Sequence, residues 1–191
     1  MSSQPKTYIP PEEYLAIERQ ADYKSEYFNG EMFAMAEASP RHVLIVTNLV
    51  AELRGQLRRR PCTVYSTDLR VRVSPTGLYT YPDVIVVCGQ VQLADDKKDT
   101  LLNPTLIIEV LSESTKDYDR GSKLQHYRAL ASLMEYVVVD QERCHVEHWV
   151  RQPEDRWLFS ETNDVTDTIR LSTIECDLVL AEVYDKVELA A

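Results

Sequence analysis

Two apolar runs that each carry one carboxylate constrain the fold of this chain more than any other feature. Residues 82–87 place Asp83 at the start of a run of valine and isoleucine, and residues 106–111 place Glu109 inside a similar run. Such runs are typical of strands that are covered on both faces. A carboxylate buried there is costly unless a cation or hydrogen-bond donors meet it. A buried salt bridge or a metal ion would satisfy these two acids, and their presence on two strands that can be neighbours favours the metal.

The order of the predicted elements indicates the fold class. Helices are predicted over residues 11–20, 41–59, 117–131 and within 178–189, with Ser114 or Thr115 as the cap of the third. Strands are predicted at 63–66, 69–73, 79–88, 105–111, 135–140, 146–150 and 157–160, and an Asn29-Gly30 hairpin turn follows the first helix. This order predicts a mixed α/β (α+β) fold with a mixed central sheet flanked by helices, and with an N-terminal helix and hairpin. The length of 191 residues fits a single domain over residues 1–191.

A lysine follows the second acidic run on the predicted helix 117–131. Asp119, Lys123 and Tyr127 recur every four residues, so they share one face of that helix. If this face packs near the ends of the strands, Lys123 reaches both acids. The alternative is an exposed ion pair between Asp119 and Lys123, which is common on helix surfaces.

Composition limits the classes of function and the compartment. The net charge of −10 counts against a protein that grips nucleic acid mainly through its overall charge. The four cysteines form no Cys-x-x-Cys pair, so we expect reduced thiols rather than a zinc site or disulfides. No apolar run is long enough to span a membrane and no secretory signal is recognisable, so we expect a cytoplasmic protein.

Arginines crowd the end of the predicted helix 41–59. They are Arg54, Arg58, Arg59 and Arg60. They form either a phosphate-binding patch or cations favoured by the negative end of the helix dipole, and the dipole interpretation is favoured. Near the start of the same helix, His42 either lines the site or is a structural histidine.

Several strings, taken together and in this order, resemble one family. They are residues 26–31 (Glu-Tyr-Phe-Asn-Gly-Glu), 81–84 (Tyr-Pro-Asp-Val), 104–115, Asp119-Arg120 with Lys123, and Glu135-Tyr136. They resemble the Uma-two family of bacterial proteins labelled restriction endonucleases, within the PD-(D/E)XK nuclease superfamily. The resemblance extends from about Pro11 to Tyr184.

This resemblance implies a restriction-endonuclease-like core and a Mg²⁺ site, with Mn²⁺ as a possible substitute. Asp83 and Glu109 match the two acids of the superfamily pattern, and the backbone carbonyl of Val110 is a further ligand. The lysine of that pattern would fall at Leu111, so Lys123 looks like a migrated lysine. Glu31, after the hairpin turn, looks like an additional acid.

Two functions from different classes remain. The first is a Mg²⁺-dependent endonuclease that hydrolyses DNA phosphodiester bonds, and the retained acids and lysine favour it. The second is a non-catalytic interaction or assembly module that keeps the nuclease fold, and the net charge favours it. We also predict a homodimer, with Trp149 and Trp157 at its interface, because such nucleases often pair two sites and symmetric dimers are the commonest oligomers.

Overall fold

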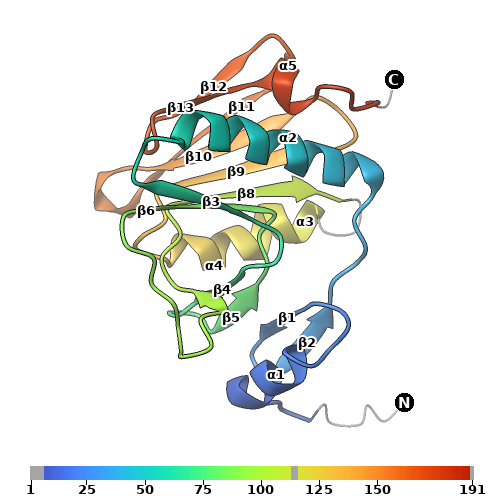
Figure 1. Ribbon diagram of the computed structural model, residues 1–191, viewed down its shortest axis with the longest axis vertical. Helices are drawn as coiled ribbons and strands as arrows, with labels where there is room; N and C mark the ends of the chain where they lie inside the picture. Colours follow the sequence, from blue (N-terminus) through green and yellow to red (C-terminus); the bar gives the residue numbers. More distant parts are fainter. Residues whose placement is uncertain (1–6, 113–115, 190–191) are drawn as a thin grey trace.

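The protein is described by a computed structural model that covers residues 7–112 and 116–189. Its main body is a six-stranded sheet in the order β11-β10-β9-β8-β6-β3 (Figure 1). The strands are β3 (Cys62–Ser66), β6 (Val84–Cys88), β8 (Leu106–Leu111), β9 (Glu135–Asp140), β10 (Val146–Arg151) and β11 (Trp157–Thr162). β8 and β9 run parallel and the other neighbours are antiparallel, so the sheet is mixed, as predicted.

Helices cover both faces of this sheet (Figure 1). One face carries α2 (Pro40–Leu57), whose buried Ile45, Leu49 and Leu53 pack in one core with alternate residues of the strands. The Ser39 hydroxyl caps α2 by accepting from the backbone N–H of His42 at 3.1 Å. The other face carries α3 (Lys116–Tyr118), the π-helical turn η1 (Asp119–Lys123) and α4 (Leu124–Arg128). Both apolar runs of the sequence therefore lie in the middle of a three-layer arrangement.

A second sheet holds the N-terminal part against the middle of the chain. Its order is β2-β1-β5-β4-β7, built from β1 (Ser25–Phe28), β2 (Glu31–Ala34), β4 (Arg70–Val73), β5 (Leu78–Thr80) and β7 (Thr100–Leu101). The helix α1 (Pro11–Glu18) packs on it through Tyr14, which stacks on Tyr27. The hairpin turn is confirmed, because Asn29 and Gly30 both have positive φ, at 48° and 84°.

Three predicted elements differ from the structure. The strand predicted at residues 79–88 is two strands in different sheets, β5 and β6, with Pro82 in the link, because proline lacks the N–H that a ladder needs. The helix predicted over 117–131 contains the π turn and ends at Arg128, and its candidate caps Ser114 and Thr115 lie outside the described residues. The predicted C-terminal helix is shorter: β12 (Thr168–Leu171) pairs with β13 (Cys176–Val179), and α5 (Leu180–Val183) follows.

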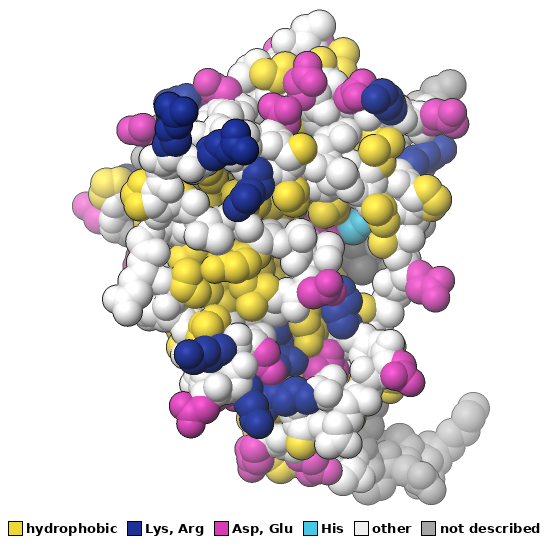
Figure 2. All heavy atoms as spheres, in the orientation of Figure 1, with side chains coloured by type: hydrophobic (Ala, Val, Ile, Leu, Met, Phe, Trp, Pro, Cys, Tyr) yellow, Lys and Arg dark blue, Asp and Glu magenta, His cyan; other side chains and the backbone are white. Residues whose placement is uncertain are grey.

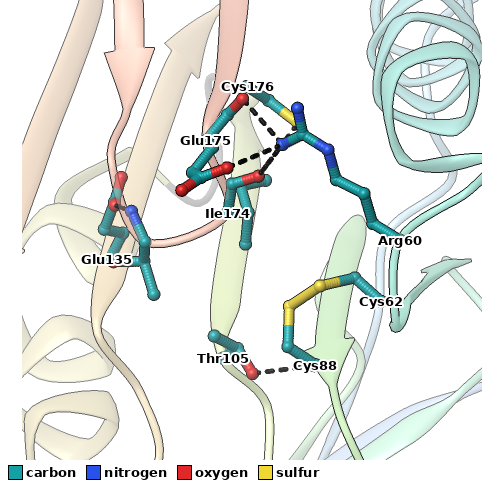
Figure 3. The surroundings of a disulfide bond; sticks show 9 residues. Arg60, Cys62, Cys88, Thr105, Glu135, Ile174, Glu175 and Cys176 are labelled. Atoms are coloured by element: carbon teal, nitrogen blue, oxygen red, sulfur yellow. Dashed lines mark hydrogen bonds and ion pairs between the residues drawn. A yellow bond between two sulfur atoms is a disulfide. The ribbon is translucent and has the colours of Figure 1, made fainter.

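The prediction of reduced cysteines is wrong for one pair. Cys62 and Cys88 form a disulfide between β3 and β6 (Figure 3). The two residues face each other in the ladder register, with Cα atoms 4.0 Å apart, although 26 positions separate them in the chain. Spacing along the sequence carries no information on such cross-strand neighbours. Cys144 and Cys176 are free.

Among the helices of the described residues, none has the length and hydropathy needed to cross a bilayer.

Candidate active site

Asp83 and Glu109 meet at one end of the six-stranded sheet. The antiparallel ladder between β6 and β8 pairs Val84 with Ile108, so the next pair in that register is Asp83 and Glu109. The backbone N–H of Asp83 lies 3.4 Å from Oε2 of Glu109, and the N–H of Val110 donates to Oδ2 of Asp83 at 2.8 Å. The two predicted acids therefore share one small region of the structure.

Lys123 lies at the centre of this region. Its Nζ is 2.9 Å from Oε1 of Glu109, 3.1 Å from Oε1 of Glu26 and 3.2 Å from Oδ1 of Asp119. All four side chains are buried. Of the two alternatives that the sequence left open, the exposed Asp119–Lys123 pair is therefore excluded, because the pair is formed but faces the strands.

The π turn explains how one short segment supplies both Asp119 and Lys123. A π turn is wider than an α turn and such turns occur often at functional sites. The hydroxyl of Tyr136 on β9 donates to the Asp119 carbonyl at 3.2 Å, which anchors this turn to the sheet. One turn later, the hydroxyl of Tyr127 donates to Oε1 of Glu109 at 2.7 Å. The spacing of four residues noted in the sequence thus delivers three groups to one side of the sheet.

The acid of the N-terminal hairpin that contacts Lys123 is Glu26, which sequence reasoning missed. Glu26 lies on β1, which is interior to its sheet, and it contacts both Lys123 and the hydroxyl of Thr80. Glu31 lies on the edge strand β2, paired with Phe28 beside the turn. Sequence reasoning had no signal for Glu26, because it shares a short motif with Glu31 and only the pairing of β1 with β5 places Glu26 in the interior of its sheet.

His42 joins the site from the first turn of α2. Its Nε2 lies 3.2 Å from Oδ2 of Asp83. Burial opposes protonation, but hydrogen bonds to Asp83 and to the backbone of Val110 outweigh it and raise the pKa of His42. Of the two interpretations of His42, the structure supports the one in which it lines the site.

The site holds more negative than positive charge. Asp83, Glu109, Glu26 and Asp119 contribute four carboxylates, and Lys123 is the buried ammonium among them. Burial raises the pKa of Glu109, and the Lys123 ammonium opposes this shift. Burial by itself would lower the pKa of Lys123, but its acidic neighbours, Glu109 first, raise that pKa well above its ordinary value. Lys123 is therefore an ammonium at neutral pH.

A divalent cation fits this donor set. Hard oxygen ligands and excess negative charge are what Mg²⁺ requires, and Mg²⁺ uses one or two carboxylates and completes its shell with water. Within residues 7–112 and 116–189, no group of three acidic, histidine or cysteine side chains is arranged to hold a metal ion by itself, so water would supply the remaining ligands. Oδ1 of Asp119 has the ion pair with Lys123 at 3.2 Å and no hydrogen bond besides it among the described residues.

Successive residues of β8 around Glu109 face opposite sides of the sheet. Glu109 and Leu111 face the side of α4, whereas Val110 packs in the core under α2. Leu111, which takes the place of the pattern's lysine, is buried in the α4-side core. The ammonium therefore reaches Glu109 from the helix instead of from the strand.

The fold and this cluster together define a class of protein: a restriction-endonuclease-like fold with acids and a lysine at the ends of its central strands. More particularly, the chain belongs to the Uma2 family, described as "Putative restriction endonuclease", whose profile matches residues 11–182.

The chain is also similar to two known proteins in sequence and to one solved structure in fold. The protein sll1609 of Synechocystis sp. (strain ATCC 27184 / PCC 6803 / Kazusa), which is uncharacterized, is 35% identical over 149 residues, 78% of this chain and 84% of the relative. The uncharacterized protein slr1290 of the same organism is 31% identical over 184 residues, 95% of this chain and 94% of the relative. A crystal structure described as a putative nuclease belonging to DUF820, from Anabaena variabilis ATCC 29413, matches with a TM-score of 0.76 at 15% identity. It covers 93% of this chain and 98% of that chain, and at this identity the likeness shows the fold.

Proposed function

We propose that this protein is a Mg²⁺-dependent endonuclease that hydrolyses DNA phosphodiester bonds, with Mn²⁺ able to replace Mg²⁺. The observation that carries the proposal is the convergence of Asp83, Glu109 and Lys123 at one end of the sheet. Membership of a family described as restriction endonucleases supports it.

Each residue has a defined task in this proposal. The carboxylates of Asp83 and Glu109 and the carbonyl of Val110 would hold the metal ion. When bound there, the ion would supply a water of lowered pKa and polarise the phosphodiester. Lys123 is already an ammonium, so it stabilises negative charge on the phosphate oxygens and does not act as a base. Glu26 and Tyr127 position these two groups through their contacts with Lys123 and Glu109.

The test measures nicking of supercoiled plasmid and cleavage of linear duplex with Mg²⁺, Mn²⁺, Ca²⁺ or a chelator. We expect cleavage with Mg²⁺ and Mn²⁺ and none with the chelator. Asp83→Asn and Glu109→Gln should each abolish it, while Arg156→Ala, a change at an exposed ion pair, should not. Cleavage that persists in both carboxamide variants would place the chemistry elsewhere or in a contaminant.

The net charge of −10 favours a second candidate, the non-catalytic assembly module. A pure protein that binds neither duplex nor divalent ions, but that forms a stable complex with another protein, would support it. Isothermal titration with Mn²⁺ separates the two candidates without any assay of cleavage, because only the nuclease needs the metal.

We also propose that the protein forms a homodimer, through the outer edge of β11. Leu158 and Phe159 on this edge strand are 60% and 48% exposed, and an unpaired strand edge is a template for pairing. Trp149 packs between Tyr136 and Phe159, and Trp157 lies against Arg151, so both tryptophans border this edge. Light scattering should give twice the mass of one chain, and Phe159→Lys should give a monomer. A monomeric wild type would refute the dimer.

A further inference from the structure

The C-terminal end of α2 borders a hollow that the active site does not use. Its volume is about 310 Å³. It is lined by Arg54, Gly55, Leu57, Arg58, Arg60, Cys62 and Val64, from the last turns of α2 and from β3. Figure 2 shows Lys and Arg side chains gathered over this end of α2. The hollow is therefore a cationic feature on a chain whose net charge is −10.

Two of these arginines have no acidic partner in the part of the chain that the structure describes. Arg54 and Arg58 are exposed and form no ion pair there. By contrast, Arg60 is already held, because its Nη1 donates to the carbonyls of Ile174 and Glu175 at 2.8 Å each (Figure 3). In a protein with 31 acidic and 21 basic residues, unpaired neighbouring arginines are available for an external anion.

Gly55 supplies an independent observation. It lies inside α2, where glycine is the poorest helix former apart from proline. A Cβ added at this position would meet nothing within 4 Å, and its φ is not in the left-handed region, so neither packing nor backbone conformation requires glycine. Gly55 belongs to the lining of the hollow and leaves open space where a side chain would stand. The dipole of α2 favours cations at its end, but it gives no reason for this glycine.

We propose that this hollow binds a backbone phosphate of the nucleic acid substrate, with Arg54 and Arg58 as its ligands. Arginine suits this role because its planar donors match the geometry of a phosphate. This inference rests on the proposed nuclease function.

The position of the hollow relative to the active site sets the size of the substrate. Arg54 and Arg58 follow His42 by 12 and 16 positions on one helix, which at about 1.5 Å per residue separates them by roughly 18–24 Å. Along one strand of duplex DNA, at about 3.4 Å per nucleotide, this distance corresponds to roughly five to seven nucleotides. The protein then contacts one substrate at two separated points, so affinity grows with duplex length up to this span.

The first experiment measures the affinity of the full-length protein for a labelled duplex of about 20 base pairs by fluorescence anisotropy, across a range of salt concentrations. Ca²⁺ replaces Mg²⁺ to prevent cleavage. The variant Arg54→Ala/Arg58→Ala is compared with Arg156→Ala/Lys97→Ala, which removes the same charge from exposed positions elsewhere. If two phosphate contacts are lost, the slope of log K against log salt becomes less steep by about 1.8 in the first variant only. Equal slopes in the two variants, or no duplex binding by wild type, would overturn the proposal.

Gly55→Leu fills the hollow without removing a charge. We expect it to weaken duplex binding while the melting temperature stays at or above the wild-type value, because leucine favours the helix. Unchanged duplex affinity in this variant would contradict the assignment.

A further arm uses inorganic phosphate to separate a nucleic acid site from a site for free phosphate. In one outcome, phosphate raises the melting temperature of wild type but not of Arg54→Ala/Arg58→Ala. If the duplex affinity of that variant then equals that of wild type, the nucleic acid assignment is overturned. Failure of the nuclease proposal looks different: wild type would bind duplex with the expected slope but would not cleave it with any metal.

Discussion

The substitution Lys123→Met tests the electrostatic description of the site most directly. It removes an ammonium that lies 2.9 to 3.2 Å from three carboxylate oxygens. Two opposite charges about 3 Å apart attract by about 5 kcal/mol at an effective dielectric constant of 20, before the cost of removing them from water. Loss of one partner from a buried ion pair typically costs about 3–5 kcal/mol, because it leaves the other charge buried without a counter-charge.

We therefore expect Lys123→Met to lower the free energy of unfolding by about 3–5 kcal/mol at neutral pH, out of a typical total of about 5–15 kcal/mol. Urea unfolding followed by tryptophan fluorescence gives this value. The burial of Lys123 among acids makes it a structural cation as well as a proposed catalytic group. Any loss of cleavage must for this reason be measured where the variant is still folded.

The companion variant Lys123→Met/Glu26→Gln separates charge imbalance from lost packing. Removing one carboxylate together with the ammonium should recover part of the stability, and added Mn²⁺ should stabilise the single variant more than wild type. Unchanged stability in Lys123→Met would refute the reasoning, since it would mean that the ammonium is hydrated or that Glu109 and its neighbours are neutral.

Three further predictions concern other contacts. Tyr127→Phe removes the 2.7 Å hydrogen bond to Glu109 and should cost about 1.5–3 kcal/mol in urea unfolding, with weaker cleavage at equal folding. Burial tends to raise the pKa of Glu135, but hydrogen bonds from His148 and a backbone amide lower it below 4.5. The ionised Glu135 carboxylate therefore stabilises the folded state above about pH 4.5, and this contribution is lost as the pH falls through the lower pKa of the folded protein. Glu135→Gln should for this reason lose less stability than wild type when the pH is lowered from about 5 to about 3. Cys62→Ser opens the disulfide that closes 26 positions and should lower stability by about 3 kcal/mol without reductant; an equal loss with reductant present would contradict the bond.

The local pattern of the sequence determined the parts of the site that depend on neighbours in the chain. The alternation of side chains along a strand is enough to place Glu109 and Leu111 on one face and Val110 on the other. The spacing of four residues is enough to align Asp119, Lys123 and Tyr127. The Asn29-Gly30 turn required only the backbone freedom of those two residues. These features were predictable because their causes extend over a few residues.

Only the tertiary structure decided which distant groups meet. The pairing of β1 with β5 places Glu26 where it meets Lys123, and the packing of α2 on the sheet brings His42 to Asp83. The register between β3 and β6 brings Cys62 to Cys88. Each of these contacts depends on a strand register or helix packing between segments far apart in the chain, and such registers are fixed by the burial of whole faces and not by any local motif. The sequence therefore determined the residue types and the local geometry of the site, and the packing of the sheets and helices determined which residues come together in it.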